Sequence, residues 1–118
     1  RISWKKAPVF FIDPDDYDVK SEKKQFKDIS AAERLEELAH RFESLDPFSE
    51  EAAENVVRAY SEELEIGAGK LIHPTRLAVS GVTRGPGLFE MLAAIGRERT
   101  VARMRRAAAY IRQKKMNV

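Results

Sequence analysis

The spacing of apolar residues predicts two amphipathic helices in the middle of the chain. From 30 to 45 these residues recur at alternating steps of four and three, which places them on one helical face: Ala31, Leu35, Leu38, Phe42 and Leu45. Ser30 and Glu33 have the spacing of a capping box that opens this helix, and Asp46-Pro47 stops it.

The second helix is predicted over residues 49–65. Ser49 is its expected cap, and its buried stripe comprises Ala53, Val56, Val57, Tyr60 and Leu64. We expect residues 29–66 to form an acidic, antiparallel helical hairpin without chemistry of its own.

Prolines and glycines divide the remainder into three further helices. Pro74 and Pro86 can open the first two, Gly81 and Gly96 can close them, and the third follows Gly96. The predicted ranges are 74–80 between Pro74 and Gly81, 86–95 between Pro86 and Gly96, and 97–113.

The predicted fold is all-α, a compact bundle or short superhelix of five or six helices in one domain spanning residues 1–118. Residues 1–28 read as an irregular arm with a polar helical turn or two near Lys20–Lys27, anchored by Trp4, Phe10 and Phe11. The expected core includes Leu35, Leu38, Val56, Tyr60, Leu77, Leu92, Val101 and Met104.

Charge is distributed unevenly along the chain. The net charge is +2, yet residues 1–66 hold 17 acidic and 10 basic side chains, whereas residues 67–118 hold 2 acidic and 11 basic ones. Such asymmetry predicts a polyanionic partner for residues 67–118, the segment expected to face it. The alternative is that the two halves neutralise each other.

Several classes of site are excluded. The absence of cysteine excludes disulfides and thiolate metal sites and is compatible with a reducing compartment. No apolar run is long enough to span a membrane. The Gly67–Lys70 stretch lacks the glycine and hydroxyl positions of a phosphate loop, and His40 and His73 have no ligand cluster nearby. We therefore expect no metal site and no catalytic residue.

Two motifs carry a family resemblance. G-K-L-I-H-P-T-R-L-A-V-S-G and G-P-G-L-F-E-M-L-A-A-I-G-R-E-R lie at 69–81 and 85–99. Together they resemble the anticodon-binding region that ends bacterial-type glutamyl-tRNA synthetases, which is a helical cage. The match is strong after Gly69 and moderate before it. With no initiator Met at residue 1, we expect a piece of a larger enzyme.

The resemblance implies base-reading residues. In the family, the arginine of P-x-R and the loop entering P-G-L face the anticodon bases; here these residues are Arg76, Gly85, Pro86, Gly87 and Leu88. Arg76 offers donors to a base edge, Gly87 permits close backbone approach, and Leu88 offers an apolar platform. Alternatively, the glycines are turn residues and Leu88 and Phe89 belong to the core; for Phe89 we prefer the core.

A basic ridge is predicted to hold phosphates. Three arginines at i, i+4 and i+7 share one face of the last helix, because Val101, Met104, Ala108 and Ile111 form its inner face. Guanidinium groups bind phosphate oxygens in a fork. The predicted phosphate contacts are Lys70, Arg84, Arg99, Arg103 and Arg106. The alternative is a solvated face with pairs to Glu90 and Glu98.

The resemblance also implies the setting. The parent would be a cytoplasmic ligase that uses ATP and Mg to attach glutamate to its tRNA, with the catalytic domain upstream of residue 1. From the resemblance we expect the tRNA for glutamate as the partner of this chain. The chain carries neither nucleotide-binding signature of that enzyme, so we expect no cofactor and no catalysis. The alternatives are a helical protein-interaction adaptor and an unrelated DNA-binding helical domain. A steep salt dependence would favour a nucleic-acid binder over the adaptor.

Overall fold

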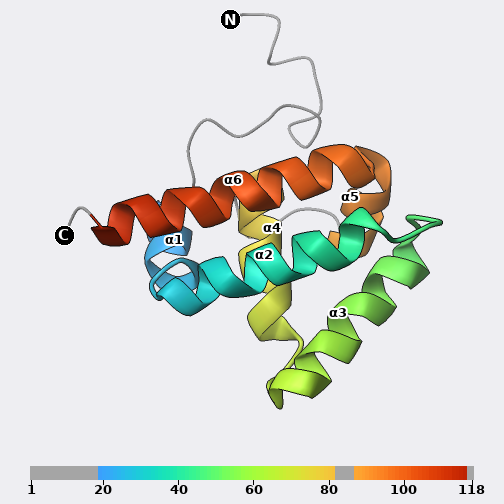
Figure 1. The fold of residues 1–118 in the computed structure, drawn as a ribbon, viewed down its shortest axis with the longest axis horizontal. Helices are drawn as coiled ribbons and strands as arrows, with labels where there is room; N and C mark the ends of the chain where they lie inside the picture. The colour runs from blue at the N-terminus through green and yellow to red at the C-terminus, as the bar shows by residue number, and fades with distance from the viewer. Residues whose placement is uncertain (1–18, 82–86, 117–118) are drawn as a thin grey trace, which may run out of the picture.

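The protein is described here by a computed structural model that covers residues 19–81 and 87–116. These residues form six helices and no strand, which confirms the all-α prediction (Figure 1). The helices are α1 (Val19–Gln25), α2 (Ile29–Glu43), α3 (Glu50–Leu64), α4 (Gly69–Ser80), α5 (Leu88–Ile95) and α6 (Arg97–Met116). Within the described ranges, no helix is long and apolar enough to cross a membrane.

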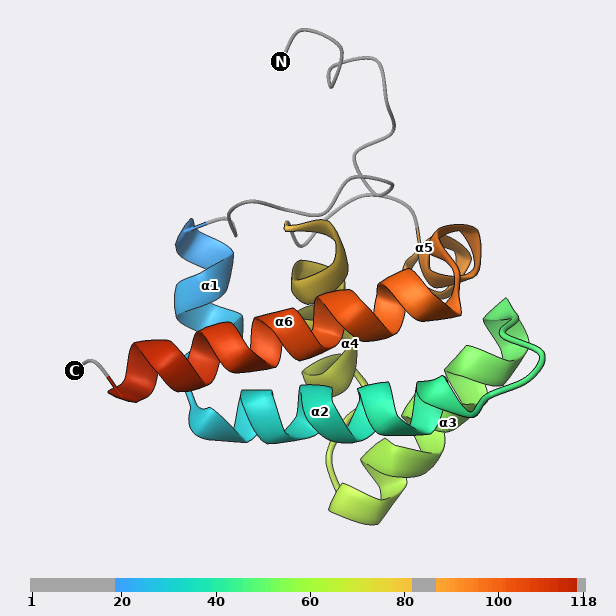
Figure 2. The same ribbon diagram turned by 45° about the horizontal axis from the view of Figure 1, so that its top comes forward.

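Helices α2 and α6 lie side by side and run in opposite directions (Figure 2). Their contact is the most extensive between any two helices. Both helices contribute almost completely buried side chains to the same core, among them Leu35, Phe42, Met104 and Ile111. The antiparallel partner of α2 is therefore chiefly α6, and α3 contacts it much less. The prediction that α2 and α3 form an antiparallel hairpin stays a prediction, since α3 contacts α2 less than α6 does.

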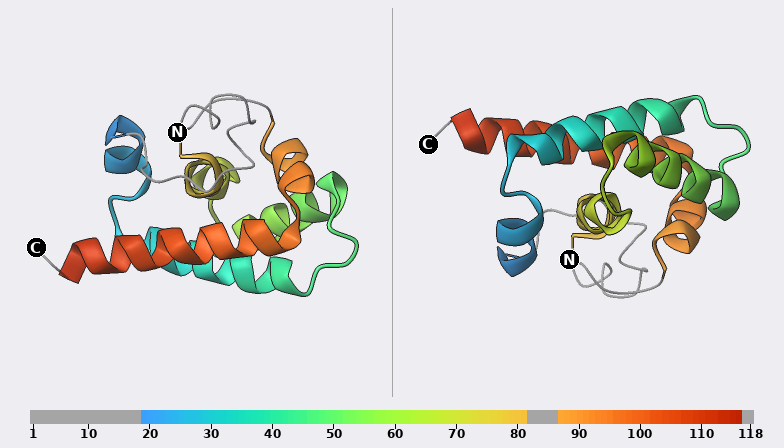
Figure 3. Two further views of the ribbon diagram at one scale, coloured as in Figure 1. Left: turned by 90° about the horizontal axis from the view of Figure 1, so that it is seen from above. Right: turned by 90° about the horizontal axis from the view of Figure 1, so that it is seen from below.

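The other helices cover one side of this pair. Helix α4 crosses behind α2 and α6 and is seen nearly end-on in Figure 3, with α1 on one side of it and α5 on the other. Leu71, Leu77 and Val79 of α4 are almost completely buried. Since α4 contacts α1, α2, α3, α5 and α6, it is the central element of the fold.

Helix α4 begins earlier than predicted. Pro74 lies inside it rather than at its first position, because Gly69–His73 already form a turn. The backbone N–H groups of Lys70 and Leu71 bond to carbonyl oxygens of the preceding turn at 3.0 and 2.9 Å. Pro74 has no N–H to donate to the Lys70 carbonyl, a local cost of a proline beyond the helix start. Burial of Leu71 and Pro74 offsets that cost.

The helix starts are only partly as predicted. The Ser49 hydroxyl accepts a hydrogen bond from the Ala52 N–H at 3.2 Å and caps α3, as expected. The predicted capping box at Ser30 is wrong. Helix α2 starts at Ile29, one residue earlier than predicted, and its N-cap residue Asp28 makes no side-chain cap bond. Helix α5 starts at Leu88 behind Gly87, two residues later than predicted.

Helix α3 ends on a non-glycine residue in the left-handed conformation. Glu65 has φ 58° and ψ 43°. Its N–H bonds to the Glu62 carbonyl at 3.1 Å, and the Ile66 N–H bonds to the Ser61 carbonyl at 3.0 Å. This is a Schellman motif, in which glycine normally takes the position of Glu65. The sequence has its glycines at 67 and 69 instead, and Gly69 begins α4.

The predicted core is confirmed with one exception. Seven of the eight predicted residues are buried, whereas Val56 is only partly buried and packs at the edge of the core. Within the predicted N-terminal arm, α1 lies where a polar helical turn or two was expected near Lys20–Lys27. The proposed anchors Trp4, Phe10 and Phe11 lie outside the described residues.

Candidate nucleic-acid interface

Three hydrogen bonds secure the carboxyl-terminal turn of α4. Gly81 has φ 83°, a left-handed conformation, and its N–H donates to the Leu77 carbonyl at 2.8 Å. The Ser80 hydroxyl donates to the Arg76 carbonyl at 2.7 Å. Arg103 of α6 donates from Nη1 to the Val79 carbonyl at 2.9 Å. These bonds give a fixed position to the helix end that leads into the predicted reading loop.

The described part of the base-reading set lies in the last part of α4 and at the start of α5. Arg76 is half-buried on α4, about one turn before the last residue of that helix, Ser80. Gly87 is exposed and has ordinary extended backbone (φ −54°, ψ 142°), and a Cβ built on it would meet no atom within 4 Å. Gly85, Pro86 and Arg84 lie outside the described residues, so their predicted roles stay predictions.

Leu88 does not have the environment that its predicted role requires. Its side chain is only 3% exposed and belongs to the hydrophobic core, whereas Phe89 is half-buried at the edge of that core. An apolar platform for a base must be accessible, so the structure contradicts this role. Leu88 instead holds the start of α5 in place, and of these two neighbours Leu88 is the more deeply buried.

Arg103 is also buried, with 2% of its surface exposed. Helical spacing alone groups it with Arg99 and Arg106, but it lies about 40° around α6 from Arg99 and about 60° from Arg106. Its side chain is on the side of α6 that packs against α4. Arg103 therefore lacks the surface position that a phosphate contact needs. In the structure its side chain binds the end of α4 instead.

Arg99 and Arg106 remain as exposed members of the ridge. They lie seven residues apart on one face of α6, and neither forms an ion pair with any residue in 19–81 or 87–116. The alternative that they pair with Glu90 and Glu98 therefore does not apply to them.

Two other arginines of α6 do neutralise acids of the first half. Arg105 binds Glu43 through Nη1 and Nη2 at 3.2 and 3.0 Å. Arg112 binds Glu36 through Nε and Nη2 at 3.1 and 2.6 Å. These hydrogen bonds lower the pKa values of both carboxyl groups below the ordinary value. The alternative of intramolecular charge pairing is correct for these two arginines.

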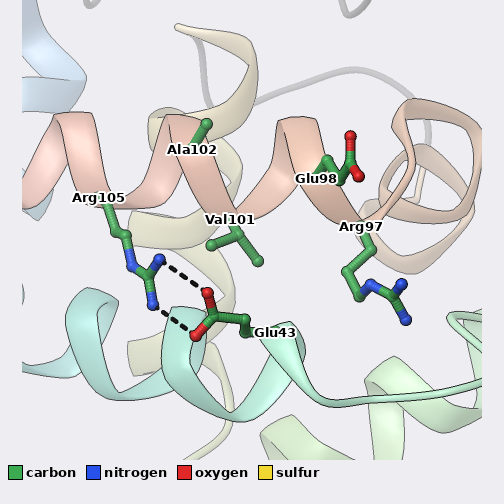
Figure 4. Close-up of a pocket in the computed structure, with 6 residues that line it drawn as sticks. All are labelled: Glu43, Arg97, Glu98, Val101, Ala102 and Arg105. Carbon is green, nitrogen blue, oxygen red and sulfur yellow. Dashed lines mark hydrogen bonds and ion pairs between the residues drawn. The ribbon is translucent and has the colours of Figure 1, made fainter.

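A hollow of about 380 Å³ between α2 and α6 contains the Arg105–Glu43 pair (Figure 4). Arg97, Glu98, Val101 and Ala102 complete its lining. Arg97 also donates from Nη1 to the Leu45 carbonyl at 2.9 Å, which ties the start of α6 to the segment after α2. Because its charges are mixed and one arginine is already paired, the hollow is a poor anion site.

Lys70 lies apart from the other predicted phosphate contacts. It is exposed at the start of α4, about 15 Å along the helix axis from Ser80 at 1.5 Å per residue. Its neighbours across a cleft are Lys24, Lys27 and Arg34. Sequence reasoning missed these three cations, because they lie in the acidic half and only the packing of α1, α2 and α4 brings them together. Among the described residues, no group of acidic and histidine side chains is arranged to hold a metal ion.

Comparison with known proteins identifies the family. The family model described as "Anticodon binding domain" matches residues 4–108. The chain belongs to this family. The anticodon-binding domain is 45% identical over 107 residues to a glutamate–tRNA ligase of Moorella thermoacetica, and 40% identical over 104 residues to that of Porphyromonas gingivalis. These alignments cover 91% and 88% of this chain but 22% and 20% of the relatives, so the chain spans about a fifth of their length.

Solved structures give the same result for the fold. The domain superposes on a glutamate tRNA ligase from Elizabethkingia meningosepticum with a TM-score of 0.84 and 29% identity, over 92% of this chain and 21% of that one. For the glutamate-tRNA synthetase of Elizabethkingia anophelis the TM-score is 0.74 at 28% identity, over 90% and 20%. The resemblance noted from the two sequence motifs is thereby confirmed.

Proposed function

We propose that this anticodon-binding domain recognises the anticodon loop of the tRNA for glutamate, as part of a longer ligase that attaches glutamate to that tRNA. The observation that carries the proposal is the junction of α4 and α5. There Arg76 lies in the last part of α4 and the exposed Gly87 precedes α5, and hydrogen bonds donated by Gly81, Ser80 and Arg103 secure the end of α4.

The chemistry of this junction suits bases that are splayed out of a loop. A guanidinium such as that of Arg76 presents planar donors that match acceptor pairs on a base edge. No side chain caps α5, so backbone N–H groups of its first turn, beginning with Leu88, are available to acceptors. Gly87 has no side chain to obstruct their approach.

We assign phosphate binding to exposed cations, two on α6 and one at the start of α4. Arg99, Arg106 and Lys70 are available for it in the structure, and Arg84 is proposed from the sequence alone. Such contacts set the position of the RNA without reading its sequence, so they complement base contacts by Arg76.

The catalytic reaction is assigned to the rest of the longer protein. That part would bind ATP and Mg, activate glutamate and receive the other end of the tRNA, in the cytoplasm. The names of the relatives and the small share of their length that this chain spans support this division of labour.

The proposal is tested with Arg76→Ala in the full-length protein, with Arg58→Ala as the matched control. Arg58 is exposed on α3, and within residues 19–81 and 87–116 its ion pair is with Glu54 of its own helix. Affinity is measured for the cognate tRNA and for a transcript with a changed anticodon. Loss of a base-reading arginine costs about 1–3 kcal/mol for the cognate tRNA and little for the changed transcript. Equal weakening of both transcripts would show that Arg76 does not read bases.

A further inference from the structure

A cleft on the side of the molecule near α1 gathers four cations around one carboxylate. Its volume is about 340 Å³, and it lies between α1, the start of α2 and the first half of α4. Lys24, Lys27, Arg34 and Lys70 line it, together with Asp28. If all five groups are ionised, the cleft carries a net charge of +3.

Within residues 19–81 and 87–116, these four cations lack the ion pairs that other basic side chains form with neighbouring glutamates. Arg41 binds Glu37 and Glu63 with contacts of 2.8 Å, and the α6 arginines described above bind the glutamates of α2. In the described part of the chain, none of the four cleft cations forms an ion pair, although Asp28 lines the same cleft. The fold thus gathers four cations without ion pairs to the described residues here, whereas Arg41, Arg105 and Arg112 are neutralised by glutamates.

The remaining lining favours a small, strongly charged anion. Ala31 and Pro74 are buried and form an apolar floor, and Gln25 and Ser30 add neutral polar groups. Among the described residues that line the cleft none is aromatic, so these residues offer no surface on which a base stacks. Three of the four cations are lysines, which act as point charges toward phosphate rather than as bidentate readers of base edges.

We propose that this cleft binds a backbone phosphate of the same tRNA, outside the bases read at the α4–α5 junction. The inference rests on the proposed function, which supplies the RNA. The axial distance along α4 from Lys70 to Ser80 is about 15 Å, which a few nucleotides of one RNA strand can span. One RNA is therefore long enough to reach both places.

The test compares two double variants of the full-length protein. Lys24→Gln/Lys27→Gln removes two charges from the cleft, and Lys20→Gln/Lys23→Gln removes two exposed charges that do not line it from the same short segment. Affinity is measured across a salt series for the cognate tRNA and for the anticodon-changed transcript. Circular dichroism verifies that every variant is folded.

We expect the cleft variant to weaken both transcripts by the same factor, roughly five- to tenfold, and to make the log K versus log salt slope shallower by about one unit. The control should change the affinity less than twofold. Lys70→Gln should resemble the cleft variant, and Lys70→Arg, which keeps the charge, should restore most of the affinity.

Results that contradict the cleft proposal can be distinguished from a result that contradicts the proposed function. If the cleft and control variants weaken binding equally, the cleft contributes only to the general field and the proposal is wrong. A cleft variant that binds both transcripts normally but lowers the melting temperature of the full-length protein would indicate contact with another part of that protein, which also overturns it. If the wild type does not distinguish the two transcripts at all, the proposed function itself fails.

Discussion

The Arg103 side chain of α6 donates a hydrogen bond to the Val79 carbonyl of α4 across 24 residues of sequence, at 2.9 Å. Val79 lies in the last turn of α4, where carbonyl groups lack partners within the helix. A buried guanidinium therefore supplies one of them, and the position of the α4–α5 junction depends on the packing of α6.

We expect Arg103→Met to destabilise the domain without altering its phosphate contacts. Methionine retains much of the volume but leaves the Val79 carbonyl without this donor, which costs about 1–3 kcal/mol in the free energy of unfolding. The exposed Arg106→Gln should change stability by less than about 0.5 kcal/mol and make the salt slope of tRNA binding shallower by up to about one unit. Urea unfolding and binding across a salt series measure the two effects. A shallower slope for Arg103→Met with unchanged stability would contradict the structural role.

Substitutions at the neighbouring residues Gly87 and Leu88 should separate an effect on core packing from an effect on tRNA binding. Leu88→Ala creates a cavity in the core and should cost about 2–5 kcal/mol of stability. Gly87→Ala adds a methyl group into open space at the start of α5 and should cost less than about 1 kcal/mol. Only Gly87→Ala is expected to weaken tRNA binding while the melting temperature stays nearly constant. Normal tRNA affinity for Gly87→Ala would argue against close approach of the RNA at this position.

Glu65→Gly should stabilise the domain. Glu65 has φ 58°, a conformation that costs a residue with a Cβ about 1–2 kcal/mol, and glycine adopts it without that cost. The greater freedom of glycine in the unfolded chain opposes the gain, so we expect a net increase of about 0.5–1 kcal/mol in urea unfolding. Glu65→Ala keeps the Cβ and serves as the control. An equal gain for alanine would show that the carboxylate, and not the backbone, is responsible.

The α2–α6 ion pairs should make stability depend on acid pH. Arg112 and Arg105 lower the pKa values of Glu36 and Glu43 in the folded protein. Their contribution is therefore fully present above the unfolded pKa of glutamate, about 4.3, and is lost as the pH falls through the lower folded values. The pairs are exposed, so the effect is small and screened by salt.

This dependence is measured as the melting temperature between pH 7 and pH 3. Glu36→Gln/Glu43→Gln should melt slightly below wild type at pH 7, and the difference should disappear at the acid end. Removing the partners in Arg105→Gln/Arg112→Gln should abolish the same pH-dependent component. A difference that persists unchanged at pH 3 would mean that the pairs contribute packing and not charge.

Local patterns in the sequence were enough for the helices and most of the core. The four–three spacing from Ala31 to Phe42 and the cap at Ser49 depend on neighbouring residues only, and both were predicted correctly. Where local rules compete, tertiary packing decides the outcome. Pro74 is a favoured first helical residue, yet burial of Leu71 extends α4 to Gly69 and leaves the proline inside.

The environment of each cation was decided by tertiary structure alone. Along the sequence Arg99, Arg103 and Arg106 form one ridge, but the contact of α6 with α4 buries Arg103 and leaves the other two exposed. Composition determined that residues 67–118 carry excess positive charge. Contacts between helices far apart in the chain decide which of those charges remain available. They also decide which lysines of the acidic half lie beside Lys70, and residue spacing does not show these contacts.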